Sequence, residues 1–275
     1  MTQTLGLIGC GNMGGAIVSG AVDDGIIKGK DIYLYDLNND AATTLAKKLG
    51  AKACASVGEL MEHSHIVILG VKPHQQKAVI DAGGDYLESC DIFVSIAAGI
   101  STATIASYHN VLANKPIVRV MPNVNALIGK SVSGICANSV ASQDDIDAVQ
   151  QIFDAVGTTH RIPEEYFGVF AALAGCSPAW TYTYIDALAQ AAVAHGLPKA
   201  QAVAIVAATV EGSAQLMLHE AQENNTVPQV LVDRVCSPGG TTVAGLLAAE
   251  DKGMSAAIRA AVNAAVKRDG ELSGS

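Results

Sequence analysis

Residues 237–242 combine residue types that could hold a small anion. They read Ser-Pro-Gly-Gly-Thr-Thr and precede an apolar, helix-like stretch. Successive backbone N–H groups around Gly239, Gly240 and Thr241 at a helix start can bind a carboxylate. The Ser237 hydroxyl can add a further donor. The structural alternative is a capped helix, in which a threonine is the N-cap and the glycines only turn the chain.

A second candidate site lies near the N-terminus, where the short apolar run 5–8 leads into Gly9-Cys10-Gly11-Asn12-Met13-Gly14. In this G-x-G-x-x-G spacing, the first glycine permits a tight turn and the second lets the backbone approach a pyrophosphate. The third allows close packing of helix on sheet. A plain tight turn is the alternative. The run follows a predicted strand and opens a predicted helix, so we expect Ile8 and residues 9–14 to bind a dinucleotide.

Asp36 strengthens this interpretation, because it ends the second predicted strand at the usual distance from such a turn. An acidic residue there usually bonds the ribose hydroxyls of NAD, whereas a 2′-phosphate would prefer a nearby Arg or Lys. Residues 35–40, Tyr-Asp-Leu-Asn-Asn-Asp, contain neither. NADH is therefore favoured over NADPH. The alternative is that Asp36 is a capping or turn residue before a helix over 39–49.

Two further loops end predicted strands and are candidates for cofactor contact. They are Val71-Lys72-Pro73 and Ala97-Ala98-Gly99. Ligands of parallel sheets lie at the carboxyl ends of the strands. Pro73 would fix the first loop, and the small residues of the second would let the backbone approach a nicotinamide ring. For Lys72, a solvated loop lysine is an equally good interpretation.

Apolar runs alternate with helix-like segments through the first half of the chain, which is typical of βαβ units and a Rossmann-like, doubly wound parallel sheet. We expect strands at 4–9, 32–35, 65–70, 91–96, 117–120, 131–137 and 156–162, and helices at 12–26, 39–49, 57–63, 74–82, 101–107 and 142–155. Pro163 breaks this pattern, and helical spacing follows. The sequence thus predicts a dinucleotide-binding domain over 1–161 and an all-α substrate-binding and dimerisation domain over 162–275.

Composition limits the partners and the compartment. The 275 residues carry a net charge of −9, and their 17 Lys and Arg residues do not cluster, which argues against nucleic acid or an anionic membrane as partner. No signal-like segment and no membrane-length apolar run is present, so we expect a cytoplasmic protein. The 6 cysteines form no C-x-x-C pair, and no metal site is expected.

Residues 199–219 predict a helix that is apolar around most of its circumference. Such a helix indicates an oligomer interface, although the central helix of a bundle would show the same pattern. A second helix, of about 18 residues, is predicted to start at Ser177-Pro178, with Ser177 as its N-cap. Glu211 lies in the apolar helix and is interpreted as a buried, partnered carboxylate or a subunit contact.

Five segments together resemble pyrroline-5-carboxylate reductase, the last enzyme of proline synthesis, in type, order and spacing. They are Gly9–Gly14, Val71-Lys72-Pro73, Ser95-Ile96-Ala97-Ala98-Gly99, Arg119-Val120-Met121-Pro122-Asn123 and Cys236-Ser237-Pro238-Gly239-Gly240-Thr241-Thr242. The first motif is generic and the last is specific. The resemblance covers nearly the whole chain. It implies an oxidoreductase that reduces the C=N bond of L-1-pyrroline-5-carboxylate to L-proline with NAD(P)H, as a homo-oligomer built from interlaced dimers.

The resemblance also implies a role for Thr242, whose hydroxyl contacts the ring nitrogen and orients the C=N bond over the nicotinamide. Hydride transfer to an iminium carbon requires little general acid–base catalysis by the protein, because a cyclic imine can bind in its protonated form. No catalytic histidine is expected. Many family members carry Ser, Asn or Arg where this chain has Asp36-Leu37-Asn38, which again favours NADH. Asn123 and Asn125 either line the cleft or brace a loop.

Two rival functions fit parts of the sequence. A 3-hydroxyacid dehydrogenase shares the N-terminal fold but needs a catalytic lysine on a second-domain helix with an asparagine shortly after it. Neither Lys199 nor Lys252 has such a neighbour. A module that senses NAD(H) without turnover explains the Gly-rich turn but not residues 237–242.

Overall fold

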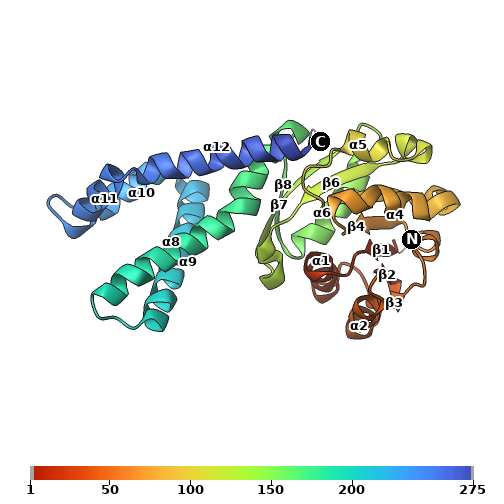
Figure 1. The fold of residues 1–275 in the computed structure, drawn as a ribbon, viewed down its shortest axis with the longest axis horizontal. Coiled ribbons are helices and arrows are strands. Elements are labelled where there is room, and N and C mark those ends of the chain that lie inside the picture. The colour runs from red at the N-terminus through yellow and green to blue at the C-terminus, as the bar shows by residue number, and fades with distance from the viewer. Residues whose placement is uncertain (1–2, 274–275) are drawn as a thin grey trace. The chain divides into compact units, whose positions relative to one another are not determined.

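The structure, a computed structural model, describes residues 3–273 and divides into two compact units (Figure 1). The sheet unit comprises the chain up to Gly175 together with the C-terminal segment from Ala265, and the helical unit comprises Cys176–Ala264. The last strand of the sheet ends at Arg161. The compact sheet unit thus continues past this strand to Gly175. The functional domain boundary at 161/162 stays a prediction.

The sheet unit is built on one sheet with the strand order β3-β2-β1-β4-β5-β6-β7-β8. The strands are β1 (Leu5–Ile8), β2 (Ile32–Tyr35), β3 (Lys52–Ala53), β4 (Ile66–Leu69), β5 (Ile92–Ser95), β6 (Ile117–Met121), β7 (Ser131–Ala137) and β8 (Gly157–Arg161). The strand order reverses between β1 and β4, which is where sheets of this type bind ligands.

The predicted doubly wound sheet is confirmed, with two departures, of which the first is the short strand β3, which was not predicted. β7 runs antiparallel to β6, whereas the other paired strands are parallel. The reason is the short connection between Met121 and Ser131, which holds a single 3₁₀ turn closed by Gly129 in the left-handed region. A parallel connection needs a crossover of a dozen or more residues. The chain therefore reverses direction.

Two layers of helices cover the sheet, because the side chains of β1 and β4 alternate between its faces. One core packs α1 (Asn12–Asp23), α2 (Asn39–Leu49) and α6 (Gln143–Asp154) against Leu5, Leu7 and their neighbours. The other packs α3 (Val57–Glu62), α4 (Gln76–Gly83) and α5 (Thr102–Ala106) against Val67, Leu69 and Phe93. The predicted helices of this half are confirmed to within a few residues.

The connection out of the sheet differs from its prediction. After a 3₁₀ turn at Glu164–Tyr166, α7 (Phe167–Phe170) passes through a π-helix at Ala171–Cys176 straight into α8 (Ser177–Ala194). Cys176, which precedes α8, already has right-handed helical backbone angles, and no side chain caps the helix. The prediction that Ser177 is an N-cap is wrong, because the chain arrives already helical.

The helical unit is all-α, as predicted. It consists of α8, α9 (Lys199–Asn224), α10 (Pro228–Val235), α11 (Thr241–Asp251) and the first part of α12 (Met254–Ser273). It leaves large apolar side chains exposed, among them Leu218 and Leu247. By length and composition α9 could cross a membrane, but one such helix is weak evidence. So much exposed apolar surface is typical of a subunit interface.

Removal of a core side chain tests the packing of α6 on the sheet. Phe153 is fully buried in the first core, so Phe153→Ala should lower the free energy of unfolding by about 3–5 kcal/mol through the cavity it leaves. Val140→Ala, at a 43% exposed position, is the control and should change it by less than about 1 kcal/mol. Urea titration followed by far-UV circular dichroism measures both, and equal effects would contradict this packing.

Candidate functional site

The Gly-rich turn between β1 and α1 contains glycines of two kinds. Gly9 has φ +100°, and a Cβ there would lie 2.7 Å from the Gly70 carbonyl oxygen. A Cβ at Gly14 would lie 2.5 Å from the Gly9 carbonyl oxygen. The fold itself therefore requires both. A Cβ at the exposed Gly11 would meet nothing within 4 Å, so the space above it is open to a ligand.

The start of α1 presents uncompensated positive charge at this open space. Gly11 is the N-cap, and no side chain caps the helix. The first N–H groups and the helix dipole therefore favour an anion there. Burial, with a smaller contribution from Asp36, raises the pKa of the Cys10 thiol to about 12. The thiol stays neutral and does not oppose an anionic ligand.

Asp36 lies directly after β2 and joins the two loops at this point. Its Oδ2 accepts the backbone N–H of Cys10 at 2.7 Å, and its Oδ1 accepts that of Asn38 at 2.8 Å. A carboxylate oxygen has two lone-pair sites, so each oxygen retains acceptor capacity for a ligand. The cap of α2 is Asn38, whose side chain accepts from Asp40. Asp36 is thus a turn residue as well as a candidate ribose ligand.

The two further predicted loops lie at the same edge of the sheet, because β1, β4 and β5 are parallel neighbours. In the first, the Lys72 backbone N–H donates to Gln75 Oε1 at 3.1 Å, and the Lys72 side chain is exposed. In the second, Ala98 is exposed and Gly99 has φ +74°. The topology therefore brings together the Gly-rich turn, Asp36 and both loops.

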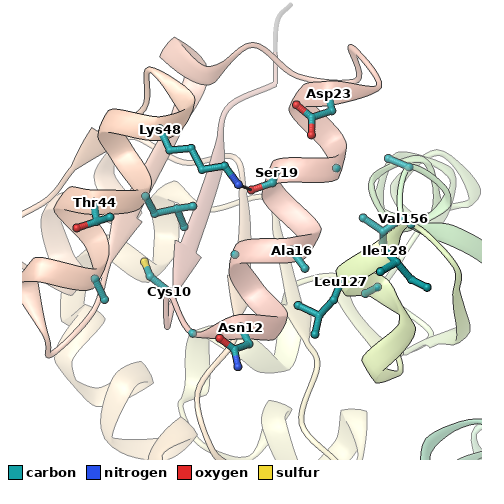
Figure 2. Close-up of a pocket in the computed structure, with 18 of the residues that line it drawn as sticks. Cys10, Asn12, Ala16, Ser19, Asp23, Thr44, Lys48, Leu127, Ile128 and Val156 are labelled. Carbon is teal, nitrogen blue, oxygen red and sulfur yellow. Dashed lines mark hydrogen bonds between the residues drawn. The ribbon is translucent and has the colours of Figure 1, made fainter. Parts of the chain in front are cut away.

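A cavity of about 950 Å³ runs along α1, between α2 and the segment around Leu127 and Ile128 (Figure 2). One end is lined by Cys10, Gly11 and Asn12, and within it Lys48 Nζ lies 3.5 Å from Ser19 Oγ. Its lining includes neither Asp36 nor the loops after β4 and β5. This cavity is a groove beside the helix, and it overlaps the predicted cofactor site only at the Gly-rich turn.

Asn123 braces a loop, which decides one of the alternatives left open by the sequence. The side chain is buried, its Nδ2 donates to the Ala174 carbonyl at 3.0 Å, and its Oδ1 accepts the Val132 N–H at 3.3 Å. Asn123 thereby fastens the π-helix to the sheet. A polar side chain satisfied in this way is structural.

The predicted carboxylate site lies in the helical unit, between α10 and α11. Gly239 has φ +69°, which favours glycine, and a Cβ at Gly240 would lie 2.4 Å from Ser237 Oγ, so a larger residue there would displace the serine hydroxyl. Gly240 is the N-cap of α11, and no side chain caps that helix. The alternative of a threonine cap is wrong. Thr241 and Thr242 are exposed, and the first N–H groups of α11 remain for an anion.

Sequence reasoning missed one polar cluster of the sheet unit. Arg119 Nη1 lies 3.1 Å from Glu164 Oε1, and the Arg119 side chain is only 7% exposed. Arg119 belongs to one of the sequence motifs, but no pattern in the sequence points to Glu164. A charged residue in the middle of an apolar strand is the signal that could have found the pair. Within residues 3–273, no group of three His, Cys, Asp or Glu residues could hold a metal ion.

Two segments of the chain match known protein families. Residues 164–272 match the family described as pyrroline-5-carboxylate reductase dimerisation, and residues 4–99 match NADP oxidoreductase coenzyme F420-dependent. Pyrroline-5-carboxylate reductase of Methanosarcina acetivorans is 34% identical over 270 residues, which is 98% of each chain.

Solved structures show the same similarity. A pyrroline-5-carboxylate reductase of Coxiella burnetii is 30% identical, with a TM-score of 0.90 over 99% of each chain. The Plasmodium falciparum pyrroline carboxylate reductase with NADP bound is 29% identical, with a TM-score of 0.86 over 98% of each chain. The likeness extends over both units.

Substitutions at two glycines test the open space above the turn. Gly11→Ala places a methyl group where the ligand would approach, so we expect the Kd for NADH to rise by about tenfold or more, equivalent to ~1.4 kcal/mol. Gly15→Ala is the matched control, because Gly15 lies on the same helix and its added Cβ would meet no atom closer than 3.8 Å. Calorimetric titration measures both. Equal affinities of the two variants would show that Gly11 does not face the cofactor.

Proposed function

The chain belongs to the pyrroline-5-carboxylate reductase family, and from this membership we propose which of its residues carry the reaction. The enzyme reduces the C=N bond of L-1-pyrroline-5-carboxylate with NAD(P)H and yields L-proline, the final step of proline biosynthesis. The observation that carries the proposal is a pair of helix starts without side-chain caps, one after the Gly-rich turn and one after the Gly-Gly turn.

We assign the first helix start to the cofactor. The open space above Gly11 and the free N–H groups of α1 suit a pyrophosphate, and the loop of small residues Ala97, Ala98 and Gly99, of which Ala98 is exposed, suits a planar ring. Val71, Lys72 and Pro73 are assigned to the same cofactor. When bound, the nicotinamide supplies the hydride.

Asp36 supports a preference for NADH. Its carboxylate has acceptor capacity for ribose hydroxyls and a negative charge that would repel a 2′-phosphate. Residues 35–40 offer no Arg or Lys to compensate such a phosphate. NADP is bound in the solved Plasmodium relative, so the preference proposed here is a property of this chain and its Asp36.

The second helix start is assigned to the substrate carboxylate. The backbone N–H groups of Gly239 and Thr241 and the hydroxyl of Ser237 supply donors, and the α11 dipole adds a positive field. Gly240 is assigned to the same site as the residue that closes the turn, because its N–H donates to the Ser237 carbonyl oxygen at 3.0 Å. Thr242 Oγ1 accepts a hydrogen bond from the protonated ring nitrogen and thereby orients the iminium. The substrate arrives protonated, so no side chain has to deliver a proton during reduction. Position and electrostatics are what the protein contributes.

The exposed apolar surface of the helical unit supports assembly into dimers. Residues 164–272 match a family that is described by its dimerisation, and α9 lies within them. An apolar helix that is little buried in one copy is then covered by a second copy. The acidic composition and 6 free cysteines support a cytoplasmic enzyme with no nucleic-acid or membrane partner.

Loss of the Thr242 hydroxyl should slow the reaction without weakening the cofactor complex. For Thr242→Ala we expect kcat/KM for the imine to fall by roughly 1–3 kcal/mol, or about 5- to 150-fold, and the Kd for NADH to stay unchanged. Thr242→Ser keeps the hydroxyl and should retain most of the activity. Absorbance at 340 nm gives the rates. Unchanged turnover of the alanine variant would remove Thr242 from the site.

Removal of the Asp36 carboxylate should change cofactor choice. Asp36→Ala also loses the hydrogen bond to Cys10, so binding of both cofactors should weaken, but the KM for NADH should rise more than that for NADPH. The informative quantity is therefore the ratio of the two KM values. Asp40→Ala removes an equal charge from the first turn of α2 and should leave the ratio unchanged. An unchanged ratio in Asp36→Ala would return Asp36 to a turn role.

A further inference from the structure

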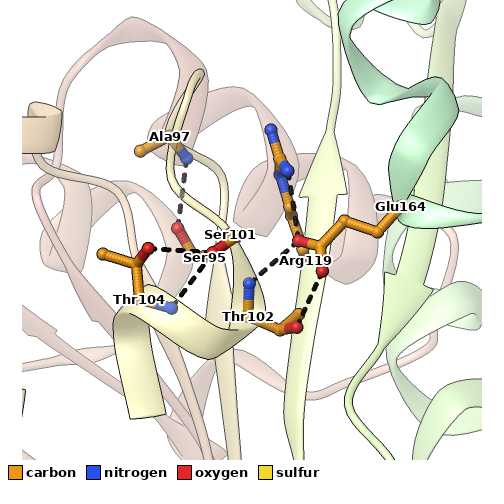
Figure 3. Close-up of polar contacts among 7 residues, drawn as sticks. All are labelled: Ser95, Ala97, Ser101, Thr102, Thr104, Arg119 and Glu164. Carbon is orange, nitrogen blue, oxygen red and sulfur yellow. Dashed lines mark hydrogen bonds and ion pairs between the residues drawn. The ribbon is translucent and has the colours of Figure 1, made fainter. Parts of the chain in front are cut away.

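The loop between β5 and α5 is anchored by polar side chains at both ends (Figure 3). At its start, the Ala97 N–H donates to Ser95 Oγ at 3.3 Å, and Ser95 Oγ also accepts from Gln76 Nε2 at 2.7 Å. At its end, Thr102 donates twice to Glu164. The backbone N–H reaches Oε1 at 2.9 Å, and the hydroxyl reaches Oε2 at 2.8 Å. The exposed middle of the loop is placed by these two anchors.

The anchor at Thr102 is more than local helix capping. Ser101 is the N-cap of α5 and accepts the Thr104 N–H at 3.0 Å, so the helix already has a side-chain cap of the usual kind. Glu164 reaches the first residue of the same helix from 62 positions further along the chain. This second contact therefore fixes α5, and with it the end of the loop, to a distant part of the sheet unit.

Arg119 holds the Glu164 carboxylate in place. Its Nη1 donates to Glu164 Oε1 at 3.1 Å, and its guanidinium carbon lies 4.4 Å from the centroid of the Phe167 ring. Arg119 is the strand neighbour of Ser95, so the two anchors of the loop are attached at adjacent positions of β5 and β6. Its Nε is buried and has no partner among residues 3–273. Displacement of Glu164 would leave a buried guanidinium uncompensated, which resists any movement of the carboxylate.

We propose that Glu164 is a positioning residue for hydride transfer, which acts through Thr102 to hold Ala98 and Gly99 at the nicotinamide. This role rests on the proposed function of that loop. A displacement of about 1 Å at a reacting group can cost about a hundredfold in rate, so a doubly anchored loop has a direct catalytic value. Glu164 touches neither cofactor nor substrate in this account. Its effect is confined to the nicotinamide half of the cofactor site.

The Thr102 hydroxyl offers the sharpest test, because it can be removed without unpairing Arg119. We expect Thr102→Val to raise the Kd for NADH by about tenfold and to lower kcat, because a loop that has lost its hydrogen bond to a charged group occupies the binding-competent position for a smaller fraction of the time. The Kd for ADP-ribose, which lacks the nicotinamide, should not change. Thr102→Ser keeps the hydroxyl and should bind both ligands as the unaltered enzyme does. A merely structural role would weaken the binding of both ligands together.

Glu164→Gln is the second variant, and it should weaken NADH binding at least as much while ADP-ribose binding is retained. If circular dichroism shows that it does not fold, the Thr102 pair decides alone. Asp147→Asn, which breaks the exposed ion pair with Arg161, is the control and should change neither Kd. Equal losses of NADH and ADP-ribose affinity in Thr102→Val, or no loss of either, would overturn the proposal.

A substitution in the loop itself separates this proposal from the proposed function. Ala98→Val adds bulk at an exposed position that we assign to the nicotinamide, so it should weaken NADH binding and spare ADP-ribose. If it does so while Thr102→Val binds NADH normally, the positioning role of Glu164 is wrong and the cofactor assignment stands. If Ala98→Val leaves NADH binding unchanged, the loop does not meet the nicotinamide and both fail.

Discussion

The close approach of Gly9 and Gly70, which follow β1 and β4, and of Gly14 in the first turn of α1 determines the geometry of the proposed cofactor edge. Side chains at Gly9, Gly14 or Gly70 would bring a Cβ to within 3 Å of backbone. Because only hydrogen atoms separate these segments, α1 starts immediately against the sheet and its first N–H groups point into open space. Gly11 faces that open space, because a Cβ added to it would meet nothing within 4 Å. The geometry is imposed by sterics before any ligand arrives.

Both proposed anion sites rely on the same physical feature in a protein that is itself strongly acidic. The net charge of −9 cannot attract an anionic cofactor or substrate from a distance, so attraction has to be local. Each site provides it with backbone N–H groups at a helix start that no side chain caps. Cys10, inside one of these turns, stays neutral because burial raises the pKa of its thiol to about 12. At both helix starts, backbone N–H groups take the place of a lysine or arginine side chain.

The sequence predicts those elements of secondary structure that depend on interactions between residues close together in the chain. The strand-turn-helix at the Gly-rich motif, the helix over 39–49 and the helical second half all follow from periodicity and cap residues. The reversal at β7 was missed, although the short connection before Ser131 carried the signal. Ser177 followed by Pro178 is typical of a helix start, which is why Ser177 was predicted to be an N-cap. The π-helix that precedes Ser177 makes the chain helical before that residue, so no helix starts there.

Long-range contacts could not be predicted in this way. Glu164 is 45 positions from Arg119 and 62 from Thr102, and no periodicity links such residues. The same holds for Asn123, whose bracing role depends on a carbonyl 51 positions away. The contacts of the exposed apolar helices could not be predicted for a different reason, because the surface proposed to cover them belongs to another copy of the chain. Candidate sites could be predicted where a motif is contiguous, whereas the distant contacts that support them could not.

The most direct test of the central claim is the oxidation of NADH and NADPH at 340 nm by the purified protein, with L-1-pyrroline-5-carboxylate as substrate. We expect imine-dependent turnover with a higher kcat/KM for NADH, and proline as the product. Turnover that is faster with NADPH would contradict the role given to Asp36. Absence of imine-dependent turnover with either cofactor, in protein that binds NADH, would contradict the account as a whole.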